Sequence, residues 1–237
     1  MKRKAFTLPF VSVGAIAFLL VGWITLSSFK TNDAPIEVTI SGNIHPTKHT
    51  PGQSGTITFS RFPVTVQEFT QIREMIGDKP HGAAALQIMA YEMYRHNRTI
   101  GEQCIRLNNT TNNINSSTGR LRELFGNDPN YQRPYQMAAF IKGATPQNGY
   151  NPTKPYKIEV RVNRAQKYQY SNDYQTTVLY LQVLTQGKST GAEGVVVLQT
   201  QKPGEPSNGK YYIVMSSPGL YSSVQAASFT SPFRGLE

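Results

Sequence analysis

The sequence predicts an α+β protein in which an N-terminal transmembrane or signal segment precedes a helical layer packed on a C-terminal antiparallel β-sheet. Three observations predict this order. The first 30 residues are set apart by an uncharged apolar run, and apolar residues then recur with a helical period up to about residue 141. After Gly143 the period changes to two, as in half-buried strands. Helices followed by sequential strands are typical of an α+β fold with helices on one face of the sheet.

The N-terminal segment has the pattern of an export signal. Lys2, Arg3 and Lys4 precede residues 10–26, which contain no charged side chain. The apolar stretch approaches the ~20 residues that span a bilayer, and the basic tip predicts a cytosolic N-terminus. We therefore expect membrane attachment through residues 5–27, with the domain outside the cytosol in the periplasm or at the cell surface. Cleavage of the segment, which would release a secreted protein, is the alternative.

Composition divides the chain into four parts. They are a signal or anchor segment (residues 1–30), a linker with a short strand (31–54), a single α+β domain (55–230) and a tail (231–237). The third part has the ordinary length of one domain.

Charge argues against nucleic acid as a partner. The net charge is +10, but four of the 24 basic residues flank the apolar segment, which leaves 20 against 14 acidic residues. Those 20 are scattered along the chain, whereas nucleic-acid binding needs clusters. Only 16% of residues are charged, which is more typical of exported than of cytosolic proteins. A single cysteine, Cys104, excludes an intramolecular disulfide.

Capping signals predict where the helices begin and end. Starts are expected at a capping box of Thr65 with Glu68, at Pro80, and at a second capping box of Thr99 with Glu102. The corresponding ends are expected at Gly77, Asn97 and Leu107. Residues 108–117 are almost wholly Asn, Thr and Ser, which predicts an exposed loop. Short helices are expected at residues 119–125 and 134–141.

Alternation of apolar and polar residues predicts the strands. They are expected at Tyr156–Val162, Thr176–Leu184 and residues 36–40, 56–59, 194–199, 211–215 and 222–226. Gly187-Lys188-Ser189 resembles the end of a phosphate-binding loop, but Gln182 stands where that loop needs glycine. A hairpin turn is therefore expected there.

A distinctive segment, residues 143–156, joins the helices to the sheet. Gly143 suits the left-handed residue that ends a helix, and Asn148-Gly149 is a tight-turn signal. Pro155 stands where a strand begins and a backbone donor is not needed. We expect a stiff crossover between the two layers.

The crossover reads GATPxNGYxPxxPY and resembles an uncharacterised family of bacterial exported proteins, a domain of unknown function. The resemblance spans residues 62–224, with looser matches at residues 82–90, at residues 101–105 and at the Ser-Ser pair 216–217 or 222–223. Tyr211-Tyr212 replaces the tryptophan usual in the penultimate strand. The resemblance implies a helix-plus-curved-sheet fold, with the nuclear-transport-factor-2 cone as the expected form. It implies no activity.

Motifs of known chemistry are missing from the sequence. It contains no HExxH, CxxC or GxSxG, so we predict no catalytic residue, no cofactor and no metal. Glu92 and His96 lie four residues apart on one expected helix, a spacing that can hold a metal. No third ligand accompanies them in the sequence, and a surface ion pair is the expected interpretation.

Tyrosines gather around the crossover. They are Tyr131, Tyr135, Tyr150 and Tyr156, with Asn148 beside them. Aromatic rings accompanied by amide side chains suit glycans or peptides. The candidate ligand-binding residues are therefore Tyr135, Asn148, Tyr150 and Tyr156. Proline–aromatic packing that locks the crossover in place is the alternative interpretation.

Together these patterns favour a non-catalytic envelope domain that binds a glycan, a peptide or an envelope protein. One alternative is an enzyme whose pocket lies in a cone-shaped sheet and unites titratable groups from among His81, His96, Asp128 and Asp173. A second alternative is a structural or assembly factor of the cell envelope tied to the anchor.

Overall fold

The described residues form a seven-stranded antiparallel sheet. Side chains alternate between its two faces, and the helices bury one of them. The strand order is β1-β2-β3-β5-β6-β7, and β4 pairs with β5. The strands are β1 (Val38–Asn43), β2 (Ser54–Phe59), β3 (Tyr156–Val162), β4 (Gln169–Ser171), β5 (Thr176–Leu184), β6 (Ala192–Gln199) and β7 (Ile213–Ser216). An antiparallel sheet in an α+β fold confirms the predicted class.

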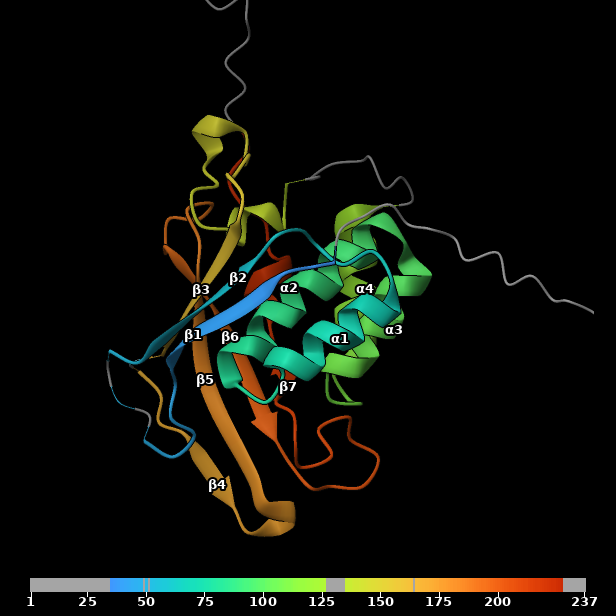
Figure 1. Ribbon diagram of the computed structural model, residues 1–237, viewed down its shortest axis with the longest axis vertical. Helices are drawn as coiled ribbons and strands as arrows, with labels where there is room; N and C mark the ends of the chain where they lie inside the picture. The colour runs from blue at the N-terminus through green and yellow to red at the C-terminus, as the bar shows by residue number, and fades with distance from the viewer. Residues whose placement is uncertain (1–34, 49, 51, 127–134, 164, 228–237) are drawn as a thin grey trace, which may run out of the picture. The chain divides into compact units, whose positions relative to one another are not determined.

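The computed structural model describes residues 35–48, 50, 52–126, 135–163 and 165–227 (Figure 1). The expected membrane segment at residues 5–27 and the predicted candidates Asp128 and Tyr131 lie outside these residues. No helix in the described ranges is long and apolar enough to cross a bilayer.

The inner strand β5 shows the alternation most clearly. Leu179, Leu181 and Val183 face the helices and are buried, whereas Tyr180 and Gln182 on the other face are half-buried. Both β3 and β5 begin and end where the sequence predicts.

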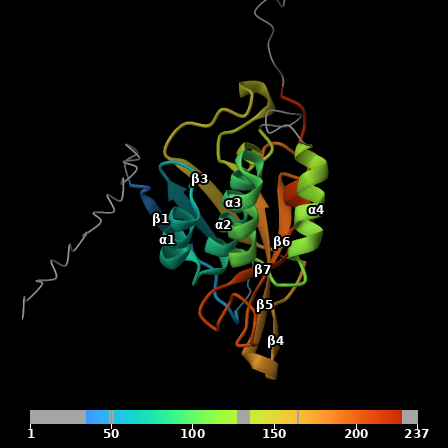
Figure 2. The same ribbon diagram turned by 90° about the vertical axis from the view of Figure 1, so that its right-hand side faces the viewer.

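Helices lie on one face of the sheet, with α2 at the centre (Figures 1 and 2). Every side chain of α2 from Pro80 to Tyr94 is buried, between the strands on one side and the other helices on the other. The helices are α1 (Val66–Ile76), α2 (Pro80–His96), α3 (Arg98–Asn108) and α4 (Ile114–Phe125), with short 3-10 turns η1 (Ala138–Phe140), η2 (Pro146–Asn148), η3 (Asp173–Gln175) and η4 (Pro218–Tyr221). The predicted starts of α1 and α2 are confirmed, and the Oγ1 of Thr65 accepts the N–H of Glu68 at 3.1 Å.

Glycine lets neighbouring helices approach α2 at two contacts. A Cβ on Gly82 would lie 1.8 Å from the carbonyl oxygen of Ile76, and one on Gly101 would lie 2.1 Å from the Cα of Tyr94. Both distances are far below van der Waals contact, so α1 and α3 each pack on α2 with no room for a side chain.

The predicted exposed loop at residues 108–117 is confirmed only for the turn at residues 111–113 and is wrong at both ends. Asn108 and Asn109 are fully buried, and α4 begins within this range. The Oε1 of Gln87, in the middle of α2, accepts the side-chain Nδ2 of Asn108 at 2.9 Å and of Asn109 at 2.8 Å. Asn109 also forms a β-bridge with Val214 of β7. Because the amides satisfy one another, residues too polar to form a core alone are buried together.

Two smaller differences concern the start of α3 and the strand β4. The Oδ1 of Asn97 accepts the N–H of Ile100 at 3.2 Å, so α3 is capped by Asn97 and not by Thr99. The strand β4 is absent from the predicted set because its three residues carry no apolar alternation.

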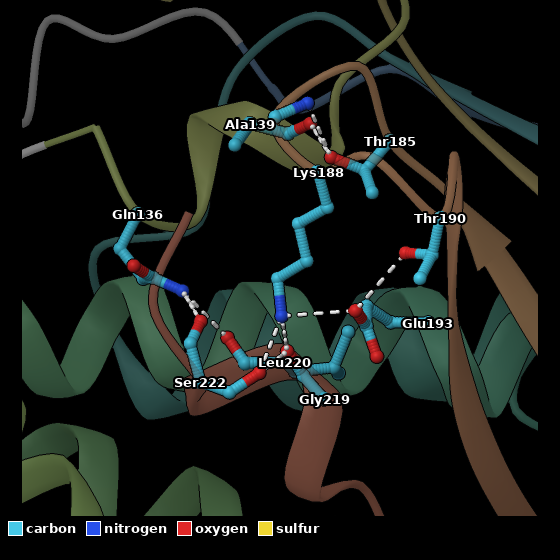
Figure 3. Close-up of polar contacts among 10 residues, drawn as sticks. Gln136, Ala139, Thr185, Lys188, Thr190, Glu193, Gly219, Leu220 and Ser222 are labelled. Atoms are coloured by element: carbon cyan, nitrogen blue, oxygen red, sulfur yellow. Dashed lines mark hydrogen bonds and ion pairs between the residues drawn. The ribbon is translucent and has the colours of Figure 1, made fainter. Parts of the chain in front are cut away.

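Side-chain hydrogen bonds explain why the described part of the predicted helix, residues 135–141, and the predicted strand at residues 222–226 do not form (Figure 3). The Oγ1 of Thr185 donates to the carbonyl oxygen of Ala139 at 2.6 Å, a carbonyl that a longer helix would use for itself. Residues 138–140 therefore form a single 3-10 turn.

The C-terminal segment is fastened in the same way (Figure 3). The Nε2 of Gln136 donates to the carbonyl oxygen of Ser222 at 2.8 Å, and the Nζ of Lys188 donates to that of Gly219 at 2.8 Å. Lys188 also contacts the Oγ of Ser222 and lies 3.0 Å from the Oε1 of Glu193. The carbonyl oxygen of Ser222, and that of Gln225, which accepts the hydroxyl of Tyr150, are thus bonded by side chains and not by a neighbouring strand.

Buried His81, at the start of α2, has no hydrogen bond of normal geometry to either ring nitrogen among the described residues. Its ring lies against Gly55, where a Cβ would come within 2.3 Å of the imidazole. The pKa of His81 is lowered to about 4, mainly by burial and to a smaller extent by the positive charge of Lys79. The approach of the Ser41 backbone and the charge of Asp78 oppose this only in part.

We predict that Gly101→Ala destabilises the full chain in detergent by about 3 kcal/mol, because the new methyl group overlaps the backbone of α2. Gly119 in α4 provides the matched control, since nothing lies within 4 Å of a Cβ placed there. Gly119→Ala should stabilise the fold by about 0.5–1 kcal/mol. Urea unfolding followed by circular dichroism measures both, and equal effects of the two variants would contradict the packing described.

We also predict that the free energy of unfolding falls by about 2 kcal/mol between pH 8 and pH 5 through His81 alone. The folded-state pKa lies below the unfolded value of 6.5, so the unfolded chain binds more protons between them. Stability is therefore complete above pH 6.5 and declines as the pH falls towards 4. His81→Phe should remove this dependence and His96→Asn should keep it; a His81→Phe variant with an unchanged pH profile would refute the assignment.

Candidate functional site

Two of the predicted crossover tyrosines lie together and pack against the protein. The rings of Tyr135 and Tyr150 stack with centroids 4.8 Å apart and an interplanar angle of 12°. Tyr150 is only 3% exposed, and its hydroxyl donates to the carbonyl oxygen of Gln225 at 2.8 Å. Gly187, in the β5–β6 turn, lies against the same ring. This contact joins the crossover to the C-terminal segment.

The other two predicted residues have different surroundings. Asn148 is exposed, but its Oδ1 accepts the N–H of Thr145 at 2.9 Å and its Nδ2 donates to the carbonyl oxygen of Gly143 at 2.8 Å. Tyr156 is half-buried and packs edge-on against Phe59, with ring centroids 5.6 Å apart. At the crossover, side chains therefore mainly hydrogen-bond and pack within the protein.

The Glu92 and His96 pair forms the expected ion pair, although the carboxylate is buried. Its Oε1 lies 3.0 Å from the Nε2 of His96 and 2.6 Å from the Nη2 of Arg95. Burial raises the pKa of Glu92, but hydrogen bonds from His96 and Arg95 outweigh it and the net pKa is lowered. The pair lines an apolar hollow of about 260 Å³ beside Phe62 and Met93. In the described ranges no cluster of three or more metal-binding side chains occurs.

Candidate nucleophiles lack an available base. Burial raises the pKa of the Cys104 thiol to about 12, which leaves it protonated. The Oγ of Ser222 contacts the Nζ of Lys188, and the same nitrogen lies 3.0 Å from the Oε1 of Glu193. His81 lies buried under the sheet. Of these groups Ser222 and Lys188 are in contact, and that lysine also bonds the carbonyl oxygen of Gly219 and pairs with Glu193.

A hollow of about 290 Å³ lies at the end of the sheet that carries β4, drawn lowest in Figure 1. Three segments line it: the loop before α4, the ends of three strands, and the β6–β7 loop. The bond from the N–H of Thr110 to the carbonyl oxygen of Val214, at 2.9 Å, holds the first wall against β7. The lining residues are Thr110, Asn112, Asn113, Thr176, Leu198, Thr200, Lys202, Glu205 and Met215.

The carboxylate of this hollow belongs to Glu205, which is only 7% exposed. Its Oε2 accepts the N–H of Thr111 at 3.1 Å and its Oε1 accepts the Oγ1 of the same residue at 3.0 Å. Among the described residues no lysine or arginine nitrogen lies within ion-pair distance of it. A carboxylate has about four acceptor positions, so acceptor capacity remains unused.

Exposed tyrosines lie on the hairpin that contains β4. None of them lines the hollow, and Tyr170 pairs with Thr177, whose buried side chain is on the helix-facing side of β5. Tyr168, Tyr170 and Tyr174 are 36%, 55% and 55% exposed, and they make up half of the exposed large apolar side chains in the described ranges. Tyr174 and Gln175 have φ values of 53° and 48°, in the left-handed region that residues other than glycine rarely adopt.

The hairpin is joined to the hollow through backbone. The N–H of Gln201 donates to the carbonyl oxygen of Tyr174 at 2.8 Å, next to Thr200 in the wall of the hollow. Thr176, which directly follows the turn, lines the hollow as well. We call the hollow and the hairpin residues 168–175 together the rim site.

Sequence reasoning did not find the rim site, although one signal was present. Residues 168–175 read YQYSNDYQ, in which aromatic residues alternate with amide and hydroxyl residues. The same criterion selected the crossover tyrosines. The residue Glu205 had no comparable signal, because its burial comes from contacts between distant loops.

Comparison with known proteins places the domain in one family. No curated protein and no solved structure matches the chain. Residues 61–228 match the family described as Domain of unknown function (DUF6935). This match covers most of the chain and agrees with the resemblance to a domain of unknown function. The chain belongs to the DUF6935 family.

Proposed function

We propose that this protein is a non-catalytic binding domain of a bacterial cell envelope and that its ligand binds at the rim site. The observation that carries the proposal is the exposure of Tyr170 and Tyr174, each 55%, on a hairpin that a backbone hydrogen bond from Gln201 joins to a hollow lined by hydroxyl, amide, carboxylate and lysine side chains. Tyrosine supplies a large contact area with little loss of side-chain entropy and is enriched in binding surfaces for that reason.

Location outside the cytosol belongs to the same proposal. The basic tip and the uncharged run at residues 5–27 support attachment to a membrane, with the domain on the outer side. A cleaved signal and a secreted domain would present the same rim site.

The alternatives have less support from the geometry. In a cone-shaped sheet like that of nuclear transport factor 2, an enzyme pocket would lie on the inner face, and here α2 packs into that face. Ligand binding at Tyr135, Asn148, Tyr150 and Tyr156 stays a prediction, but the hydroxyl of Tyr150 and the amide of Asn148 already bond within the protein. A structural or assembly role stays a prediction without an observation that favours it.

We predict that the double variant Tyr170→Ala with Tyr174→Ala reduces retention of the full chain on isolated native cell envelopes by about tenfold or more. Both rings are exposed, so their loss should remove ligand contact and leave the unfolding temperature nearly unchanged. Co-sedimentation in detergent over a range of envelope concentrations measures the retention.

Met75→Ala is the matched control, because Met75 on α1 is 54% exposed and lies outside the rim site. Its retention should equal that of the parent chain. Absence of retention by the parent chain, or an equal loss in both variants, would contradict the proposal.

A further inference from the structure

We propose that β1 is an interface between two copies of this chain, which pair edge to edge across a two-fold axis. This inference goes beyond the proposed function and does not depend on the rim site. It rests on three features of the sheet: a strand with an open edge, an order of side chains in that strand that suits pairing with its own copy, and protection of the other marginal strands.

The strand β1, at one margin of the sheet, carries backbone groups without partners (Figure 2). The N–H of Ser60 donates to the carbonyl oxygen of Glu37 at 3.1 Å, in register with the pairs that join β1 to β2. Because alternate residues of an antiparallel strand bond the same neighbour, Thr39 also directs its backbone groups towards β2. Val38 and Ile40 therefore direct theirs to the open side, where no hydrogen bond joins them to the rest of the described chain.

The other marginal strands are protected against pairing. β7 is covered by the loop before α4, since Asn109 bridges to Val214 and the carbonyl oxygen of Val214 accepts the N–H of Thr110 at 2.9 Å. β4 has three residues, and short edge strands resist pairing. β1 has six residues, and its sequence VTISGN contains neither a charged side chain nor a proline, the usual devices that keep an edge from pairing.

The order of side chains in β1 suits an antiparallel pair made with its own copy. With Thr39 at the two-fold axis, Val38 lies opposite the partner's Ile40, and backbone hydrogen bonds form between these two residues in both directions. Both side chains lie on the helix-facing side of the sheet, because their partners in β2 are the buried Phe59 and Ile57. Apolar side chains therefore meet on one face, and on the other face threonine meets threonine, a pair that stabilises neighbouring strands.

Charge does not oppose this pairing. Glu37 is the one charged side chain in residues 35–43, and the same register places it opposite the partner's Ser41. The two copies of Glu37 are then about 13 Å apart along the strands, since four residues at ~3.3 Å each separate them. That distance exceeds the screening length of about 8 Å at physiological ionic strength.

A second copy also explains where the association stops. Because pairing uses the open edge of β1 in both copies, it closes at two chains and does not continue into a fibre. A strand of another protein could bond the same backbone groups, but β1 itself meets each requirement of the edge. One strand from each copy makes a small interface, so we expect a weak dimer that is best detected by trapping.

The test traps the pair with a disulfide. The full chain carrying Thr39→Cys is oxidised mildly in native cell envelopes and analysed on a non-reducing gel. The proposed register places the two copies of residue 39 directly opposite each other as a non-hydrogen-bonded pair, with Cα atoms about 4.5 Å apart, a distance that a disulfide can span. We therefore expect a species of twice the chain mass. Cys104 is the one native cysteine and is buried, so it should not compete.

Ser41→Cys is the matched control, because residues 39 and 41 are exposed on the same face of β1. The two copies of residue 41 are about 13 Å apart in the proposed pair, so we expect about tenfold less dimer than with Thr39→Cys. Under reducing conditions both variants should unfold at the temperature of the parent chain, since each replaces an exposed side chain.

Three results would overturn the proposal. They are equal cross-linking of the two variants, no dimer from Thr39→Cys, and a disulfide from Thr39→Cys to a different envelope protein in place of a second copy. The last result would assign the edge of β1 to a strand of that protein. Retention on envelopes through the rim site is a separate measurement, so the proposed function stands or falls independently of this test.

Discussion

The burial of α2 is the constraint on which the rest of the structure depends. A helix with no exposed side chain from Pro80 to Tyr94 must find partners inside the protein for most of the polar groups it carries, and His81 is an exception. Near its middle, Gln87 bonds to Asn108 and Asn109, and Asn109 pairs in turn with β7. The loop that follows therefore lies beside the end of the sheet, where it forms a wall of the hollow. The position of the candidate site is thus set by one amide in the core.

The same constraint explains why the site lies at the margin of the fold. Since α2 occupies the inner face of the sheet, side chains that could surround a central ligand are used for packing. Loops at the strand ends lie at the surface, and binding residues in many folds concentrate there. The hairpin and the β6–β7 loop are segments of this kind, and a rigid sheet holds both.

Local patterns in the sequence predict the elements that depend on local physics. Alternation gave the limits of β3 and β5, and the cap at Thr65 and the proline at residue 80 gave the starts of two helices. The prediction of an exposed loop at residues 108–117 failed at its start because the burial of Asn108 and Asn109 depends on Gln87, more than 20 residues away. The predicted C-terminal strand did not form because Gln136 bonds the carbonyl oxygen of Ser222 and Tyr150 bonds that of Gln225. The tyrosines of the crossover and of the hairpin look alike in composition, and only the fold separates the buried Tyr150 from the exposed Tyr170.

That separation carries the functional argument. A left-handed conformation at residues such as Tyr174 and Gln175 costs about 1–3 kcal/mol each. In the crossover, the left-handed Tyr150 is offset by stacking on Tyr135 and by a hydrogen bond to Gln225. In the hairpin, hydrogen bonds fix the backbone, but the ring of Tyr174 stays exposed. The two left-handed tyrosines therefore differ in one respect: the ring of Tyr150 is used for packing inside the protein, whereas the ring of Tyr174 remains accessible.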